Sequence, residues 1–351
     1  MGGKPAAERP GAVGRSRPVA VWLFAVALVV FAMVVVGGAT RLTGSGLSIT
    51  QWRPVSGAIP PMMASAWNRD FALYRATPQY RLVNRGMSLA EFRFIFWWEW
   101  AHRLLGRLAG AAFAVPLAAF LFARAMPRRL IGPCLGLFAL GGLQGAVGWW
   151  MVKSGLEARV LVAPERLATH LGLALALLAA LLWTGLEAEF GPPAPGTGRR
   201  DGWTWASAIL ALAIFVQCLL GALVAGNHGG LVDGDWPLMG GRVFPSDYWR
   251  GSLWESLAHG QAASQFDHRM LAYLIFAAAI ALAAQAARSG AAPAAIRFLA
   301  AALALAASAQ AGLGIATLLA GVPLTLAILH QAGAAILLAT AVALAWRSRR
   351  R

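Results

Sequence analysis

The chain has 351 residues and a formal net charge of +16; 59% of its residues are hydrophobic and 13% are charged. Soluble domains contain roughly 45–50% apolar and 25% charged residues, so this composition excludes an ordinary soluble protein. Apolar runs of about 20 residues recur along the chain, and each is long enough to cross a bilayer as a helix. The basic residues lie in short segments between these runs. Membrane topology therefore explains the charge better than nucleic-acid binding.

The apolar runs predict an all-α integral membrane protein with eight transmembrane helices. Their approximate bounds are 19–38, 96–123, 131–151, 168–185, 204–225, 267–287, 296–319 and 325–346. If the N-terminus is inside, basic residues are denser on the inner side, as the positive-inside rule requires. We therefore expect a multi-pass protein of the inner (cytoplasmic) membrane with both termini in the cytoplasm. The pattern Ser88 to Glu91 is typical of a capping box, so the second helix should begin outside the membrane core.

The two halves of the chain resemble each other, which indicates an internal repeat. Glu99-Trp-Ala-His102-Arg103 at the start of the second span matches Gln265-Phe-Asp-His268-Arg269 at the sixth. Four spans per half is an even number, so both halves enter the membrane in the same sense. This predicts two repeated four-helix bundles related by a pseudo-twofold axis along the membrane normal. The corresponding division is an N-tail (1–18), an N-terminal half (19–190), a linker (191–203), a C-terminal half (204–346) and a basic C-tail (347–351).

Four of the six histidines lie within about two turns of the outer ends of the even-numbered spans: His102, His170, His268 and His330. Metal-binding or ionisable groups inside spans usually face the bundle interior and mark a site. A histidine pair on facing helices with small neighbours suits axial ligation of heme, whereas zinc or copper would need further carboxylate or thiolate ligands. Any one of these histidines alone could instead be an interfacial residue bonded to a carbonyl. Pairing within a half or across the halves stays open.

The remaining two histidines, His228 and His259, lie in the second long outer segment without counterparts in the first half. We interpret them as ordinary loop residues.

Glu99 stands three positions before His102, on the same helix face and about one turn further outward. Its counterpart in the second half is Gln265. A carboxylate in one half and an amide in the other indicate that a duplicated heme site diverged, with chemistry in the first half and cofactor holding in the second. The alternative is a pair between Glu99 and Arg103 that steadies the helix end.

Three arginines lie beside the predicted heme sites on the outer side, where heme propionates would emerge: Arg41, Arg103 and Arg269. Arginine suits bidentate contacts with carboxylates, although interfacial anchoring explains each one equally well.

These residues resemble the heme A synthase family, in the form found in mitochondria and alphaproteobacteria. The resemblance covers nearly the whole chain after the N-tail. Its most specific stretches are Gly37 to Ser48 (GGATRLTGSGLS), Trp52 to Pro61 (WRPVSGAIPP), Thr77 to Tyr80 (TPQY), Glu91 to Arg103 (EFRFIFWWEWAHR), Trp236 to Met239 (WPLM) and Asp267 to Arg269 (DHR).

The resemblance implies that a ring methyl of heme O is oxidised to a formyl group in successive hydroxylation steps, giving heme A for terminal oxidase assembly. It also implies heme b as cofactor. By the same resemblance, His102 and His170 would face the substrate heme, His268 and His330 would ligate heme b, and Glu99 matches the family's essential carboxylate.

The resemblance also suggests partners: heme O synthase (a farnesyltransferase), oxidase assembly factors and membrane lipid. An electron acceptor is required but not identified, and homo-oligomerisation stays open.

Two other classes of protein compete with this interpretation. A di-heme electron-transfer protein of the cytochrome b type would place its hemes toward opposite membrane faces, whereas all four histidines here are expected near one face. A transporter would have broken helices and polar groups near the bilayer centre, yet spans six to eight are almost uniformly Ala and Leu there.

Overall fold

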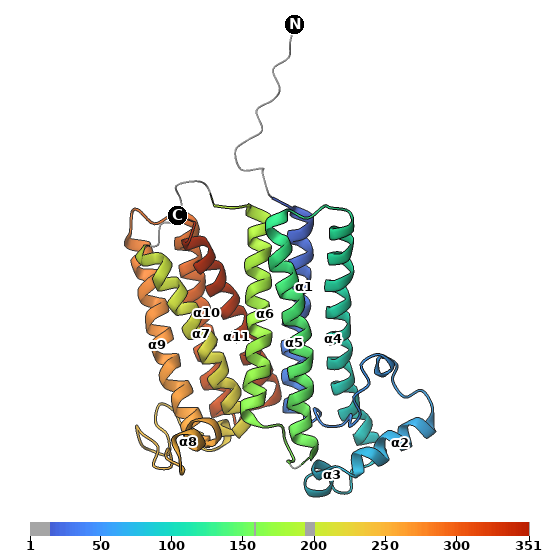
Figure 1. Ribbon diagram of the computed structural model, residues 1–351. Coiled ribbons are helices and arrows are strands. Elements are labelled where there is room, and N and C mark those ends of the chain that lie inside the picture. Colours follow the sequence, from blue (N-terminus) through green and yellow to red (C-terminus); the bar gives the residue numbers. More distant parts are fainter. Residues whose placement is uncertain (1–14, 158, 194–200, 351) are drawn as a thin grey trace.

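The computed structural model describes residues 15–157, 159–193 and 201–350, in which eight long helices run side by side (Figure 1). All eight are long and apolar enough to cross a membrane, which confirms the all-α multi-pass architecture and the eight predicted spans. Most of them extend a few residues beyond the predicted ends. They are α1 (Arg17–Leu42), α4 (Leu89–Phe122), α5 (Arg128–Glu157), α6 (Pro164–Phe190), α7 (Gly202–Asn227), α9 (Gln261–Arg288), α10 (Ala294–Leu319) and α11 (Leu324–Ser348).

The two long connecting segments lie at one end of the bundle, which we call the loop end (Figure 1). The first contains η1 (Ser56–Ala58), α2 (Ala64–Arg75) and α3 (Pro78–Leu82), and the second contains η2 (Gly229–Leu231) and α8 (Leu253–His259). The start of α1 and the end of α11 lie at the opposite end, the termini end. Most of the predicted linker (194–200), most of the N-tail (1–14) and Arg351 lie outside the described residues.

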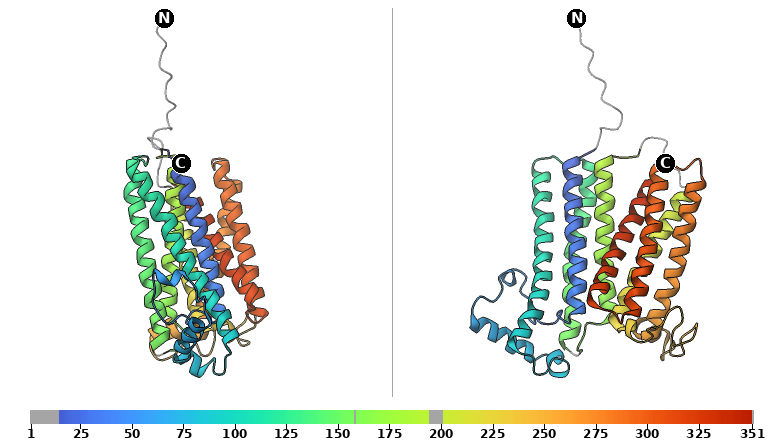
Figure 2. Two further views of the ribbon diagram at one scale, coloured as in Figure 1. Left: turned by 90° about the vertical axis from the view of Figure 1, so that its right-hand side faces the viewer. Right: turned by 180° about the vertical axis from the view of Figure 1, so that it is seen from behind.

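Helices of the N-terminal half lie on one side of the molecule and those of the C-terminal half on the other, and both views of Figure 2 agree with this. In the N-terminal half α1 contacts α4 and α6, and α5 contacts α6; in the C-terminal half α7 contacts α9 and α11, and α10 contacts α11. The matching helices thus have matching neighbours. One difference stands out: α9 packs closely on α10, but α4 and α5 touch each other much less.

The seam between the halves is formed by α6 against α7 and by α1 against α11. Its interior is a continuous apolar core that includes Leu23, Leu181, Ile214 and Leu338, all nearly inaccessible to solvent. Small residues permit the close approach: at Gly172 of α6 the space for a side chain is taken by Leu219 of α7. Such small-residue contacts are how helices associate in lipid, where no hydrophobic drive exists between them.

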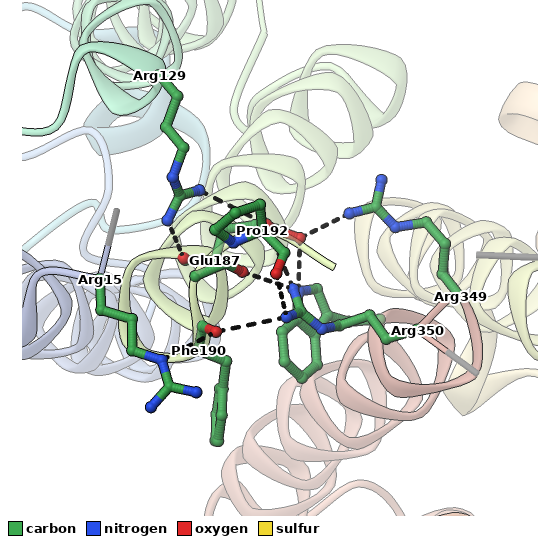
Figure 3. A network of polar contacts seen from close by, with 9 residues as sticks. Arg15, Arg129, Glu187, Phe190, Pro192, Arg349 and Arg350 are labelled. Atoms are coloured by element: carbon green, nitrogen blue, oxygen red, sulfur yellow. Dashed lines mark hydrogen bonds and ion pairs between the residues drawn. The ribbon is translucent and has the colours of Figure 1, made fainter. Parts of the chain in front are cut away.

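A polar network closes this seam at the termini end (Figure 3). The Glu187 carboxylate of α6 accepts hydrogen bonds from Trp346 Nε1 at 2.9 Å and from Arg349 at 2.6 Å. It also pairs with Arg129 of α5 at 3.7 Å and with Arg350 at 3.6 Å. The last turn of α11 is thereby tied to two helices of the other half.

At the loop end, α4 begins with the predicted capping box: Ser88 Oγ accepts from the backbone N–H of Glu91, whose carboxylate accepts from the N–H of Ser88 at 2.8 Å. The exposed first turns of α4 then pack against α2 through an aromatic cluster of Trp67, Tyr74 and Phe92. The first loop is therefore a folded layer fixed to α4 just beyond the membrane span.

Candidate functional site

The four histidines singled out from the sequence all lie near the loop end, in the first part of α4, α6, α9 and α11. Each packs against a glycine of a neighbouring helix, at a position where a Cβ would come within about 3 Å of the imidazole ring. The pairs and these distances are Gly37 with His102 (2.9 Å), Gly148 with His170 (2.8 Å), Gly221 with His268 (3.1 Å) and Gly314 with His330 (2.9 Å). The same helix pairs carry the same contact in both halves.

The structure brings His268 and His330 together inside the C-terminal half. Their ring centroids are 6.4 Å apart with an angle of 80° between the planes. Bonds from a metal to imidazole nitrogen are about 2 Å long, so this separation leaves room for one metal ion between the two rings. The geometry fits axial ligation of a heme iron by these two residues.

A glutamine also contacts Nδ1 of each ring of this pair. Gln217 Nε2 lies 3.0 Å from Nδ1 of His268 and donates to the His268 carbonyl at 2.8 Å. Gln310 Nε2 lies 3.1 Å from Nδ1 of His330 and donates to the His330 carbonyl at 2.8 Å. Hydrogen bonds to the second ring nitrogen are what orient metal-binding histidines in proteins.

The corresponding pair in the N-terminal half, His102 and His170, is close enough for electrostatic interaction between the rings. Here the Nδ1 atoms of both residues are buried and, within the described part of the chain, have no hydrogen-bond partner. Gln144 donates to the His170 carbonyl at 3.0 Å but not to its ring. The two histidine sites thus share one framework and differ in how the rings are held.

Glu99 is buried, with 3% of its surface exposed, and its carboxylate contacts the first loop. Oε2 accepts from Ser48 Oγ at 2.7 Å and from the Ile49 N–H at 2.8 Å. Oε1 accepts from Arg103 at 2.6 Å, and the same Arg103 nitrogen donates to the Ile49 carbonyl at 2.9 Å. The ion pair considered from the sequence is therefore present, as part of a larger arrangement that holds the loop over the end of the site. Three donors, one of them a guanidinium, suit an ionised carboxylate.

The second half repeats this arrangement with an amide. Gln265 Nε2 donates to the Asp233 carbonyl at 3.0 Å, and Arg269 donates to Asp233 at 3.1 Å and to the Leu238 carbonyl at 2.8 Å. Arg103 and Arg269 thus hold the two loops in the same way. The local geometry is therefore the same in the two halves, but Glu99 carries a carboxylate where Gln265 carries a neutral amide.

Among the three arginines expected near propionates, Arg41 differs from the other two. It lies in the last turn of α1, near enough to His228 of the second half for electrostatic interaction. Within the described residues no hydrogen bond or ion pair engages its side chain. The guanidinium groups of Arg103 and Arg269 bind loop carbonyls instead.

The two loop histidines take no part in either pair. His228 ends α7 in a left-handed backbone conformation. His259 lies 4.0 Å from Glu165 of α6, beside the seam between the halves.

Three glutamines behind the rings were not identified from the sequence as site residues. The available signal was their spacing: Gln144, Gln217 and Gln310 each stand four residues before a glycine that contacts a histidine. One helical turn separates such positions, so each glutamine and its glycine lie on the same helix face as the ring. The sequence offered the spacing but no indication of which glycines touch histidines.

All four histidines lie in the first part of helices that begin at the loop end, so the described residues do not have the arrangement expected of a transmembrane electron carrier, with heme sites toward opposite faces. The described transmembrane helices are also continuous, unlike the broken helices expected of a transporter.

Comparison with known proteins agrees with this site. The sequence model of a family described as cytochrome oxidase assembly protein matches residues 20–342. A heme A synthase from Caulobacter sp. (strain K31) is 60% identical over 337 residues, covering 96% of this chain and 97% of that protein. The heme A synthases of Caulobacter vibrioides and Maricaulis maris are 58% and 46% identical over the same shares of each chain. The chain therefore belongs to the heme A synthase family.

Proposed function

We propose that this protein converts heme O to heme A by oxidising a ring methyl to a formyl group in successive hydroxylation steps. The observation that carries this proposal beyond family membership is the asymmetry of two matching histidine sites. One site has a buried carboxylate, Glu99, one turn from His102, whereas the other has an amide, Gln265, at the equivalent position. A protein that only conducts electrons between two hemes has no need for this difference.

The C-terminal half is the site of a resident cofactor, heme b, with His268 and His330 as axial ligands. The separation of 6.4 Å between the ring centroids and the glutamine at Nδ1 of each ring support this assignment. Heme b would accept electrons one at a time and pass them on. The chain's own contribution is to fix both rings and to keep the pair within an apolar bundle.

The N-terminal half takes the substrate, heme O, with His102 and His170 facing its iron. A substrate with a long hydrocarbon tail dissolves in the bilayer, and the limited contact between α4 and α5 favours lateral access from lipid to this half. Arg41 is the residue best placed to bind a propionate, because its side chain has no other partner among the described residues. The division into a substrate half (19–190) and a cofactor half (204–346) follows from these assignments.

Glu99 is the proposed catalytic carboxylate. Its three donors hold it as a fixed negative charge one helical turn from His102, and such a charge would stabilise positive charge that develops on the reacting methyl carbon as electrons leave. A role as proton acceptor would require it to exchange one of these partners, so we favour electrostatic stabilisation.

The loop end, with both histidine pairs, is the outer side of the inner membrane, and the termini are cytoplasmic. The arginines around Glu187 at the termini end are typical of a cytoplasmic face. Heme O synthase as the source of substrate and oxidase assembly factors as recipients of the product are the partners that this chemistry calls for.

The direct test is expression of the protein in a host that makes heme O but not heme A, followed by chromatography and mass spectrometry of extracted hemes. We expect heme A and its hydroxylated precursor in cells with the intact chain, and neither in cells with the Glu99→Gln variant at equal protein level. Unchanged heme O in both would refute the proposed reaction.

A further inference from the structure

Four positions, one in each helix that faces a histidine, are equivalent: each stands four residues before the glycine on which the ring packs. Three of them carry glutamine and the fourth carries methionine. They are Gln144, Gln217, Gln310 and Met33. Met33 lies against α4 beside His102, because a side chain at Gly106 would meet its Cε at 3.4 Å. Met33 thus occupies, for His102, the place that Gln217 occupies for His268.

At His102 and His268 this difference coincides with whether Nδ1 of the ring has a partner; at His170, Gln144 donates to the main-chain carbonyl only. Gln217 contacts Nδ1 of His268 at 3.0 Å, whereas Nδ1 of His102 is buried without one. The Oε1 atom of Gln217 is buried and likewise without a partner among the described residues. A half-turn of the amide exchanges its oxygen and nitrogen, so the glutamine can also accept from an Nδ1–H. That is the form of an imidazole whose Nε2 binds a metal. A methionine thioether offers no comparable acceptor.

Such partners matter for retention of the metal, since removing them typically lowers metal affinity about 10- to 100-fold. A resident cofactor has to stay through every catalytic cycle, but a substrate heme has to leave once it is oxidised. The cofactor pair has a glutamine at both rings, and the substrate pair has one at neither Nδ1. The packing of α4 on α5 is also looser than that of α9 on α10, which favours easier release of heme from the N-terminal half.

We propose that Met33 is the positioning residue that makes the heme of the N-terminal half exchangeable, by withholding the Nδ1 hydrogen bond that fixes the resident heme in the C-terminal half. This inference rests on the proposed function, in which the first half takes the substrate and the second half the cofactor. It predicts that one substitution at Met33 slows heme release from the N-terminal half, and that one substitution at Gln217 speeds heme release from the C-terminal half.

The test measures heme release from the purified full chain, by transfer to an excess of apo-myoglobin followed by absorbance. With heme O loaded, Met33→Gln should slow release from the N-terminal half about 10- to 100-fold, and the conservative variant Met33→Leu should leave the rate within about twofold of wild type. With the resident heme, Gln217→Met should speed release by a similar factor. Either of two results would overturn the proposal: equal release rates for Met33→Gln and Met33→Leu, or no effect of Gln217→Met.

If Met33→Gln does not insert into the membrane, Gln217→Met still tests the proposal. An unchanged release rate of the resident heme from Gln217→Met is by itself enough to refute the proposal. The outcomes also separate this inference from the proposed function. If the wild-type chain converts heme O but the release rates do not change, Met33 has no such role. If the wild-type chain binds no heme O, the function itself fails.

Discussion

Gln331 of α11 fills the space that a side chain at Gly38 of α1 would occupy, and its amide donates a hydrogen bond to the Val34 carbonyl at 2.6 Å. Gln331 follows His330 in the chain, and Gly38 follows Gly37, against which His102 packs. One polar contact across the seam therefore connects α11, which carries His330, with the part of α1 against which His102 packs. It fixes the position of one histidine pair relative to the other.

Replacing Gly38 with alanine should displace the Gln331 amide from this space and break its hydrogen bond, which costs about 1 kcal/mol. We expect a lower midpoint of thermal unfolding for Gly38→Ala in detergent. In a Gln331→Ala background the same substitution should cost less, because the two residues are coupled. Strictly additive effects would show that the contact does not join the halves as described.

Replacing Glu99 with glutamine should abolish product formation while leaving heme b in place. The amide is tolerated at this position of the fold, because Gln265 fills the equivalent place and still holds its loop. We expect at least a 100-fold fall in the rate of heme O oxidation, on the order of the loss seen when one electrostatic group is removed from an active site. Gln265→Glu is the matched control and should not gain a second reaction. Substantial activity in Glu99→Gln would exclude the catalytic role.

The two histidine pairs should respond differently to alanine substitution. His268→Ala or His330→Ala removes one of the proposed axial ligands of heme b, so the heme B content of the purified chain should drop strongly. His102→Ala and His170→Ala should keep heme B but lose heme O binding, as measured by reduced-minus-oxidised spectra and extracted heme. Loss of the same heme from His102→Ala and from His268→Ala would instead indicate a heme shared across the halves.

Replacing Glu187 with glutamine should destabilise the termini end of the seam, because this carboxylate of α6 compensates three arginines there, one on α5 and two at the end of α11 (Figure 3). Breaking a largely buried ion pair on one side leaves uncompensated charge. We expect a lower midpoint of thermal unfolding with unchanged heme spectra. Glu189→Gln, on the same helix and with no hydrogen bond or ion pair from its side chain among the described residues, is the matched control. Equal midpoints for both variants would show that the network contributes nothing measurable.

The sequence predicted the spans because twenty-residue apolar runs have few alternatives in a bilayer, and the α4 start because Ser88 and Glu91 form a recognisable cap. It also predicted that the four histidines lie near the same end of the second, fourth, sixth and eighth spans. It could not predict that Arg103 and Arg269 bind loop carbonyls, since the loops fold back through contacts far apart in the chain. The contacts of the glutamines with the histidines could not be predicted for the same reason. A polar residue in an apolar helix can be assigned a role only when the residue that it contacts on the neighbouring helix is known.

The central claim is that one half keeps a heme b while the other binds and oxidises heme O. Quantitative extraction of hemes from the purified full chain, made with a heme O source, tests it most directly. We predict one equivalent of heme B that persists through purification, together with a smaller, exchangeable amount of heme O, its hydroxylated derivative or heme A. Substitution of His268 should remove the heme B alone. Heme B as the only heme, at two equivalents per chain, would contradict the account and indicate an electron-transfer protein.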